Sequence, residues 1–238
     1  DFLSGLAATM ERPQAILMVS AHWETEIPAV NAVASNDTIH DFYGFPRPLY
    51  ELRYPAPGSA ILAERVTALL TDAGLPSAVD RNRGLDHGAW VPLMLAWPDA
   101  DIPVVQLSVQ TDLGPAHHLA LGRALEPLQD EGVLIIGSGS YTHDLSSFRK
   151  PLQEDNPDWV RAFADWFDAA LAEGRTDDLL AYRLLAPEAA HNHPTEEHLL
   201  PLFVALGAAG PDWTARHLHQ SITHRILRMD AYAFDRAA

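Results

Sequence analysis

The feature that most constrains the fold of this chain is a short, unbroken apolar segment, Ala15–Val19, which continues through two small residues into His22. Consecutive apolar residues over this length are typical of a strand buried on both faces, as in the interior of a parallel sheet. In open α/β sheets, ligands and catalytic groups gather at the carboxyl ends of such strands. His22 stands at that end and is therefore the first candidate site residue.

Further strand and helix patterns alternate along the chain. Apolar runs predict strands over Ile27–Ala34, Ala78–Val79, Ile102–Val109 and Gly132–Gly137. Apolar spacing, N-caps and prolines predict helices over Phe2–Met10, Ser59–Ala73, Val91–Ala96, Pro115–Gln129, Pro157–Glu173, Asp177–Leu185 and His191–Ala209. The segment Ala215–Phe234 predicts two closing strands with a bend at Gln220–His224. The alternation predicts an α/β fold, a single domain over residues 1–238 with a central, largely parallel sheet flanked by helices.

Composition narrows the classes of function. The chain has 238 residues, with 32 acidic and 16 basic side chains and a formal net charge of −16. Such a surface repels phosphate backbones and anionic membranes, so we expect no nucleic-acid partner and no membrane partner. No apolar run approaches the roughly 18 residues of a membrane helix, and no signal peptide is evident. Cysteine is absent, which favours a cytoplasmic protein and requires any metal site to use histidine, aspartate or glutamate.

Four of the 12 histidines stand where a loop follows a strand or precedes a helix: His22, His87, His143 and His198. Neutral imidazoles suit Zn²⁺ and Fe²⁺, and histidines that converge from separate strand ends can hold an ion with open positions for substrate. Histidine is also the natural acid or base near neutral pH. The alternative is that these are surface or capping histidines, because the chain has no short local motif such as H-E-x-x-H.

A long segment rich in proline, glycine and aromatic residues, His40–Gly58, follows the second predicted strand. A loop of this length inside a compact domain is usually functional or disordered, and its five aromatic residues argue against disorder. We interpret it as an ordered wall or lid over a pocket, whose aromatic residues, including Tyr50, either stack on a flat substrate or pack the loop onto the core. His40 is expected either to bind polar groups of the substrate or to fix the loop.

Several short motifs occur in one order along the chain. They are SAHW at Ser20–Trp23, HDF at His40–Phe42, GFP at Gly44–Pro46, YPAPG at Tyr54–Gly58, DHG at Asp86–Gly88, GSG at Gly137–Gly139, HDL at His143–Leu145 and EHLLPL at Glu197–Leu202. This series resembles the 4,5-DOPA dioxygenase group of the LigB-type, class III extradiol ring-cleavage dioxygenases. The resemblance extends from Pro13 to about Ala208.

The resemblance implies an α/β fold and the opening of a catechol-type, DOPA-like ring next to its diol by O₂. It implies non-haem Fe²⁺ for catalysis, with zinc often held by the resting protein. It also implies that His22 and His198 bind the metal, that His143 touches the ion and serves as acid or base, and that His87 lies near the substrate. The resemblance assigns no role to His193, which is expected either to contact the pocket or to precede the helix that follows it.

The sequence departs from the relatives at two points. Relatives begin with a strand ending in Gly-His-Gly-Ser-Pro, whose histidine is another metal ligand, and no counterpart of this strand is present. Because the sequence begins at Asp1 without a methionine, we expect that it is trimmed. Relatives commonly carry asparagine where this chain has Asp144, and a carboxylate there is expected to make His143 more basic.

Two other functions remain compatible with the same histidines. One is a zinc-dependent hydrolase, which would activate water on the ion instead of cleaving a ring with O₂. The other is a non-catalytic metal-binding module, which the missing N-terminal ligand favours. For the dioxygenase, the expected partners are a small catechol substrate and O₂.

Overall fold

The computed structural model of the chain describes residues 2–149 and 155–236. The chain folds as two compact units. The first comprises Asp1–Gln110 and Ala124–Ser138, and the second comprises Thr111–Arg123 and Gly139–Ala238. The predicted α/β class is confirmed, with a mostly parallel five-stranded sheet in the first unit and C-terminal antiparallel strands in the second.

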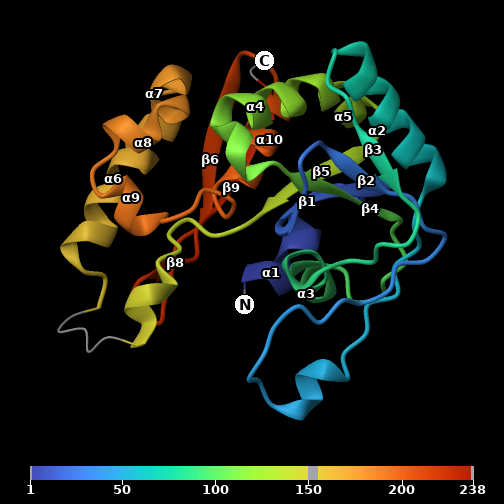
Figure 1. The fold of residues 1–238 in the computed structure, drawn as a ribbon, viewed down its shortest axis with the longest axis horizontal. Coiled ribbons are helices and arrows are strands. Elements are labelled where there is room, and N and C mark those ends of the chain that lie inside the picture. Colours follow the sequence, from blue (N-terminus) through green and yellow to red (C-terminus); the bar gives the residue numbers. More distant parts are fainter. Residues whose placement is uncertain (1, 150–154, 237–238) are drawn as a thin grey trace. The chain divides into compact units, whose positions relative to one another are not determined.

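The sheet of the first unit is built around the apolar segment at the start of the chain (Figure 1). Its strand order is β3 (Ala78–Asp80), β2 (Ala29–Asn31), β4 (Val104–Val109), β1 (Ala15–Glu24) and β5 (Val133–Ser138). Strand β1 pairs in parallel with both β4 and β5, whereas β2 pairs in parallel with β3 and antiparallel with β4. The predicted strand Ile27–Ala34 is shorter than expected, and Pro28, which has no N–H to donate to a ladder, accounts for its later start.

The prediction that β1 is buried on both faces is confirmed. Ile16 and Met18 pack in one hydrophobic cluster with Trp90 and Leu93 of α3 (His87–Ala96). Successive side chains of a strand alternate between its faces, and the intervening Leu17 is fully buried as well. Burial on both faces therefore fixes β1 within the sheet. Its polar residues, Ser20 and His22, follow the apolar core residues toward the carboxyl end of the strand.

The other helices of the first unit follow the predicted pattern with shifted ends. Helix α1 (Phe2–Leu6) continues as the 3₁₀ turn η1 (Ala7–Thr9), and α2 (Ala60–Asp72) is capped by Ser59, whose hydroxyl accepts from the amide of Leu62. A 3₁₀ turn η2 (Arg47–Tyr50) lies in the aromatic segment. The predicted helix Pro115–Gln129 is interrupted before Pro127, which opens the short α5 (Pro127–Asp130).

The second unit contains the remaining helices and two small antiparallel sheets. Its elements are η3 (Thr111–Leu113), α4 (Gly114–Leu125, which ends in the first unit), η4 (Leu145–Arg149), α6 (Asp158–Ala172), α7 (Thr176–Leu180), α8 (Tyr182–Leu185), α9 (Ala189–Asn192), α10 (Leu200–Ala208), β6 (Trp213–His219), β7 (Ile222–Thr223), β8 (Leu227–Arg228) and β9 (Ala231–Arg236). Strands β6 and β9 pair with each other, as do β7 and β8. The two predicted closing strands are confirmed, but the connection between them is longer and contains the β7–β8 pair.

Two predicted helices of the second unit are broken in the structure. The segment Asp177–Leu185 divides at Ala181 into α7 and α8. The helix predicted over His191–Ala209 divides into α9 and α10, because proline disfavours helical conformation in the residue before it and Pro194 follows His193, whose φ and ψ are −127° and 83°. His198 therefore lies in the non-helical stretch just before α10 rather than within a helix.

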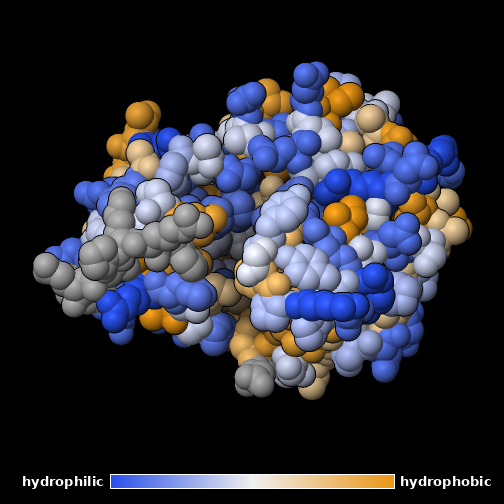
Figure 2. All heavy atoms as spheres, turned by 60° about the horizontal axis from the view of Figure 1, so that its bottom comes forward, coloured by the Kyte–Doolittle hydropathy of each residue, from blue (hydrophilic) through white to orange (hydrophobic). Residues whose placement is uncertain are grey.

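On the face shown in Figure 2, hydrophilic residues cover most of the surface and hydrophobic ones are scattered among them. Among the described residues, no helix combines the length and the apolar character needed to span a membrane.

Two glycines allow close contact between helices α4 and α10 in the second unit. A Cβ atom at Gly122 would lie 2.2 Å from the carbonyl oxygen of Val204, and one at Gly207 would lie 2.3 Å from the carbonyl oxygen of Leu119. Contacts this short with backbone atoms force the helices apart. The approach therefore requires residues without a side chain at both positions.

We expect Gly122→Ala to destabilise the protein by about 1–3 kcal/mol through overpacking against the α10 backbone. Urea unfolding followed by circular dichroism measures this change. Gly5→Ala in α1 is the matched control, because no heavy atom lies within 4 Å of a Cβ placed there. Equal stability of the two variants would contradict the close packing of α4 and α10.

His118 in α4 is a buried histidine that must remain neutral. Burial lowers the pKa of its imidazole from the ordinary 6.5 to about 4, although a hydrogen bond to the carbonyl of Gly114 opposes the shift. Its Nδ1 lies 2.7 Å from that oxygen. Since the unfolded chain then binds a proton more readily than the folded one, stability is lost as the pH falls below 6.5.

We expect His118→Asn, whose amide can replace the Nδ1–H donor, to lose less stability than the wild type between about pH 7 and pH 5. The difference expected from the lowered pKa is on the order of 1–2 kcal/mol. Urea unfolding at both pH values measures it. Parallel pH profiles for the two proteins would show that His118 is not the acid-sensitive group.

Candidate active site

His22 is held near the carboxyl end of β1 by a hydrogen-bonded serine and aspartate. The hydroxyl of Ser20 accepts from the His22 backbone amide at 3.2 Å and donates to Asp86 Oδ1 at 2.7 Å. Asp86 is fully buried and also caps α3 by accepting from the amide of Ala89. One carboxylate thus ties the end of β1 to the start of α3.

His87 is the first residue of α3, four residues earlier than the start that the sequence predicts for this helix. The centroids of the His22 and His87 rings are 4.0 Å apart. This approach depends on Gly88, since a Cβ there would lie 2.4 Å from Ser20 Oγ and 3.0 Å from His22 Cδ2. The DHG motif therefore supplies a helix cap, a candidate site histidine and the space for a second ring.

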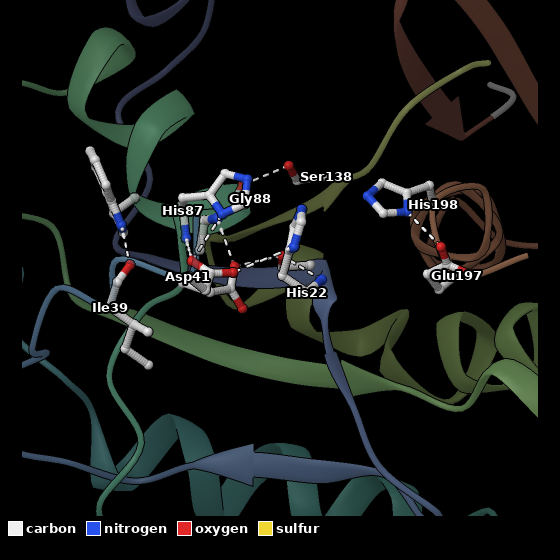
Figure 3. Close-up of polar contacts among 12 residues, drawn as sticks. His22, Ile39, Asp41, His87, Gly88, Ser138, Glu197 and His198 are labelled. Atoms are coloured by element: carbon white, nitrogen blue, oxygen red, sulfur yellow. Dashed lines mark hydrogen bonds and ion pairs between the residues drawn. The ribbon is translucent and has the colours of Figure 1, made fainter. Parts of the chain in front are cut away.

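Asp41 joins these two histidines (Figure 3). Its Oδ1 lies 2.9 Å from His87 Nδ1 and accepts from the His87 backbone amide at 2.9 Å, while its Oδ2 lies 3.4 Å from His22 Nδ1. Burial alone would raise the pKa of the Asp41 carboxyl, but the hydrogen bonds from His87 outweigh it and hold this pKa at about 2. Asp41 is therefore an anion at neutral pH.

The second unit brings His143, Glu197 and His198 together. The rings of His143 and His198 stack with centroids 3.4 Å apart. Glu197 Oε1 lies 2.9 Å from His198 Nδ1 and accepts from the hydroxyl of Thr195 at 3.0 Å. Burial would raise the pKa of the Glu197 carboxyl, but the hydrogen bonds from His198 and Thr195 lower it to about 2.

The backbone around this second cluster is tightly fixed. A Cβ at Gly139 would lie 2.0 Å from the carbonyl oxygen of His198, and that oxygen accepts from the amide of Ser140 at 2.8 Å. The amide of His143 donates to the carbonyl of Asn192 at 2.8 Å. The GSG motif therefore places the strand-end loop directly against the backbone of His198.

Both clusters suit a metal ion by their donor chemistry. In each, three residues offer imidazole nitrogen or carboxylate oxygen atoms that lie within 4.8 Å of one another. A histidine that donates Nδ1–H to a carboxylate keeps the lone pair of Nε2 for a metal, and this is the usual arrangement around metal-binding histidines. His198 with Glu197 has this arrangement.

The residues predicted to bind substrate have varied surroundings. His40 Nε2 lies 3.1 Å from the carbonyl oxygen of Leu52, and Tyr50 OH lies 3.4 Å from the carbonyl oxygen of Phe42. Both contacts lie within the aromatic loop, and Phe42 packs edge-on against His87 at 5.5 Å. His40 thus makes the loop contacts expected of a residue that fixes the loop, and the substrate roles of His40 and Tyr50 stay predictions.

His193 is fully buried in the second unit. Its Nε2 lies 3.0 Å from the carbonyl oxygen of Tyr141, and burial lowers the pKa of its imidazole to about 4. Its Nδ1 has no hydrogen-bond partner among the described residues. A neutral ring that donates Nε2–H to Tyr141 leaves an acceptor at Nδ1.

Sequence reasoning did not identify the roles of two carboxylates. Asp41 and Glu197 were not among the predicted site residues, but both contact histidine side chains. Asp144, expected to act on His143, accepts from the amide of Ser146 and lies 3.5 Å from His191 Nε2. The available signal was the adjacency of an acidic residue to a candidate histidine, as in Glu197-His198.

A third cluster of similar composition is ion-paired with an arginine of the protein. Asp168, His217 and Asp230 have ligand atoms within 4.8 Å of one another. The guanidinium of Arg228 lies 3.4 Å from Asp168 and 2.7 Å from Asp230, and the hydroxyls of Tyr141 and Tyr232 donate to Asp168. This is an internal ion-pair network rather than a metal site.

An α/β fold with histidine and carboxylate clusters near its strand ends is compatible with a metal-dependent enzyme. Residues 4–234 match the family described as the catalytic LigB subunit of aromatic ring-opening dioxygenase. The chain belongs to this family. It is therefore an aromatic ring-opening dioxygenase of the extradiol class, an oxidoreductase of a metal-dependent family.

Individual relatives agree with this assignment. The chain is 51% identical over 225 residues to the 4,5-DOPA dioxygenase extradiol of Beta vulgaris, covering 94% of this chain and 84% of the relative. It is 41% identical over 206 residues to the protein of that name in Escherichia coli K12, covering 85% and 75%. The crystal structure of an uncharacterised E. coli K12 protein matches with a TM-score of 0.82 and 35% identity, covering 97% and 89%. The predicted family and fold class are confirmed.

We expect Glu197→Gln to weaken divalent-metal binding about 10-fold and Glu197→Ala to weaken it more, because the partner of a ligating histidine tunes its basicity and orientation. Isothermal titration with Zn²⁺ measures the affinity. Glu64→Gln, at an exposed position on α2, is the control and should bind like the wild type. Unchanged affinity in both Glu197 variants would remove His198 from the candidate metal site.

Proposed function

We propose that this protein opens a catechol-type, DOPA-like ring next to its diol with O₂, using Fe²⁺. The observation that carries the proposal is the family match over residues 4–234, together with relatives named 4,5-DOPA dioxygenase extradiol at 41–51% identity. Because that match spans both compact units, we propose that they serve as one catalytic domain.

The proposed metal ligands are His22, His198 and His143. The support for His198 is its Nδ1 contact with Glu197, because metal-binding histidines usually donate their other ring N–H to a carboxylate or carbonyl. His22 is supported by its place near the end of β1 and by the carboxylate of Asp41 near its Nδ1. Bound there, Fe²⁺ would supply the Lewis acidity that lowers the pKa of the catechol hydroxyls and the redox chemistry with O₂. Zn²⁺ suits the same ligands and can occupy the site in a purified protein.

The proposed catalytic residues are His143 and His87. His143 accepts a proton from the catechol and later donates one to assist cleavage of the O–O bond, so that both oxygen atoms enter the ring-opened product. His87 holds a catechol hydroxyl through Nε2, since its Nδ1 faces Asp41. Removing a positioned acid or base costs on the order of 10²–10⁴-fold in rate.

The proposed substrate-binding residues are His40, Tyr50 and His193. His193 has the clearest support, because its buried Nδ1 is an acceptor without a partner among the described residues. A substrate hydroxyl or ammonium group would satisfy it, and an unsatisfied buried acceptor is otherwise costly. The support for Tyr50 and His40 is that they belong to the aromatic loop whose Phe42 packs against Tyr50 and His87.

The experiment is anaerobic reconstitution with Fe²⁺ followed by addition of L-DOPA and simpler catechols in the presence of O₂. We expect a yellow ring-opened product and consumption of one O₂ per ring. His143→Gln should lower kcat about 10²–10⁴-fold, and His198→Ala should lose the metal. His219→Gln, on the outer strand β6, serves as the control.

The same assay separates the alternatives. Ring opening requires O₂ and should not survive replacement of iron by zinc, whereas a hydrolase would keep its activity under both conditions. The relatives, which are named as dioxygenases, do not favour a hydrolase or a non-catalytic module. Absence of turnover with every catechol by the iron-loaded protein would contradict the proposal.

A further inference from the structure

His22 stands on β1 at a point where the pairing of the strand is irregular. Strand β1 pairs with β5 through Ser20, and it pairs with β4 through Val19 and again at Glu24, with a shift of register between these two residues. His22 lies inside that interval. Bulges of a strand are frequent next to active sites, where they re-aim a side chain. Contacts from outside the regular ladder therefore contribute to holding the backbone of His22.

These contacts lead from both sides of His22 to the carboxylate of Asp86. The hydroxyl of Ser20 accepts from the His22 amide at 3.2 Å and donates to Asp86 Oδ1 at 2.7 Å. Arg83 Nη2 donates to Asp86 Oδ2 at 3.1 Å and to the carbonyl oxygen of His22 at 3.4 Å. Asp86 is thus connected to the N–H of His22 through one side chain and to its C=O through another.

Arg83 is itself held at both its backbone and its guanidinium. Its amide donates to Asp80 Oδ1 at 3.0 Å, and its carbonyl accepts from Asn31 Nδ2 at 3.1 Å. The guanidinium carbon lies 4.7 Å from the centroid of the Trp23 ring, and a cation over an aromatic face is attracted by the ring. The residue that follows His22 therefore helps to keep Arg83 in place.

The carboxylate of Asp86 is fully supplied with hydrogen-bond donors. Its side chain is fully buried, whereas that of Arg83 is 21% exposed. Among the described residues, its two oxygens accept from Ser20 Oγ, the Ala89 amide, Arg83 Nη2 and Gln106 Nε2. An ionised carboxylate offers about four acceptor sites and no donor. A buried polar network that is satisfied in this way is rigid.

We propose that Asp86 is a positioning residue for His22, which acts through Ser20 on the amide of His22 and through Arg83 on its carbonyl. The inference rests on the proposed function, in which His22 binds the metal. The effect of Asp86 on the reaction is exerted through the backbone of His22. The same carboxylate caps α3, which begins at His87, and the rings of His22 and His87 lie side by side (Figure 3).

Replacement by asparagine separates this role from that of a helix cap. The amide oxygen can take the place of Oδ1 and accept from Ser20 and from the Ala89 amide, since asparagine caps helices as well as aspartate does. The amide nitrogen then faces the guanidinium of Arg83, which has no acceptor. Asp86→Asn therefore keeps the cap and releases Arg83 from the network.

The first test is NMR of the metal-free protein. In Ser20→Ala we expect the amide of His22 to exchange its hydrogen about 10-fold faster, while exchange over Ile16–Val19 stays at the wild-type rate. Ser77→Ala is the matched control, because the hydroxyl of Ser77 has no hydrogen-bond partner among the described residues. Unchanged exchange at His22, or equal acceleration over Ile16–Val19, would overturn the inference.

The carbonyl of His22 is followed in the same way. In Asp86→Asn and in Arg83→Gln we expect its ¹³C resonance to move upfield, because the carbonyl loses a donor. Arg81→Gln, at an exposed position two residues earlier, is the matched control and should leave this resonance unchanged. A wild-type carbonyl resonance in both Asp86→Asn and Arg83→Gln would show that Arg83 does not hold His22.

The second test is Zn²⁺ affinity by isothermal titration. We expect Ser20→Ala, Asp86→Asn and Arg83→Gln each to weaken binding about 10-fold, as substitutions behind a ligating histidine do, and Arg81→Gln to bind like the wild type. Wild-type affinity in Asp86→Asn would reduce Asp86 to a helix cap. Thermal unfolding identifies any variant that does not fold, and Ser20→Ala, which removes a single hydroxyl, then carries the test.

The outcomes also distinguish this inference from the proposed function. If His22→Ala binds Zn²⁺ as tightly as the wild type, His22 is not a ligand and the proposed metal site is wrong, whatever the NMR of the Asp86 network shows. If His22→Ala loses affinity but Asp86→Asn and Ser20→Ala bind like the wild type, only the positioning role of Asp86 is wrong.

Discussion

The burial of β1 between two parallel neighbours is the constraint on which the first unit depends. Strands β4 and β5 pair with it on either side, and its apolar residues are buried on both faces of the sheet. A one-residue slip would exchange the two buried faces, so the register is strongly specified. His22 thereby acquires a fixed position, and Gly88 then allows the start of α3 to approach its ring.

Both candidate clusters contain the same local arrangement, a partly buried anionic carboxylate against a histidine Nδ1. Asp41 contacts the Nδ1 atoms of His87 and His22, and Glu197 contacts that of His198. In each case hydrogen bonds to the ionised form overcome the effect of burial on the pKa of the acid. The carboxylates thus remain charged beside the imidazole rings, an arrangement that is common around metal-binding histidines.

The sequence predicted what local pattern determines and missed what depends on distant partners. Strand β1, helix α2 with its Ser59 cap, and the apolar face of α6 follow from periodicity and capping. The break before α10 follows from Pro194, which is a local signal. The prediction nevertheless extended one helix across it, because the apolar run after Pro194 has helical spacing. The role of Asp41 was not predictable from spacing, because it needs the aromatic loop folded against His87, a residue 46 positions away.

The cluster around Asp168 shows why residue types alone do not define a metal site. Its two carboxylates and His217 resemble the composition of the other clusters, yet the guanidinium of Arg228 contacts both carboxylates. A guanidinium cannot be deprotonated in a protein, so a metal cation would meet a permanent like charge. The network instead supports the loop that leads to His143, because Tyr141 donates to Asp168 and the Arg228 amide donates to Thr142 Oγ1. The same chemistry therefore positions a candidate catalytic residue without binding an ion.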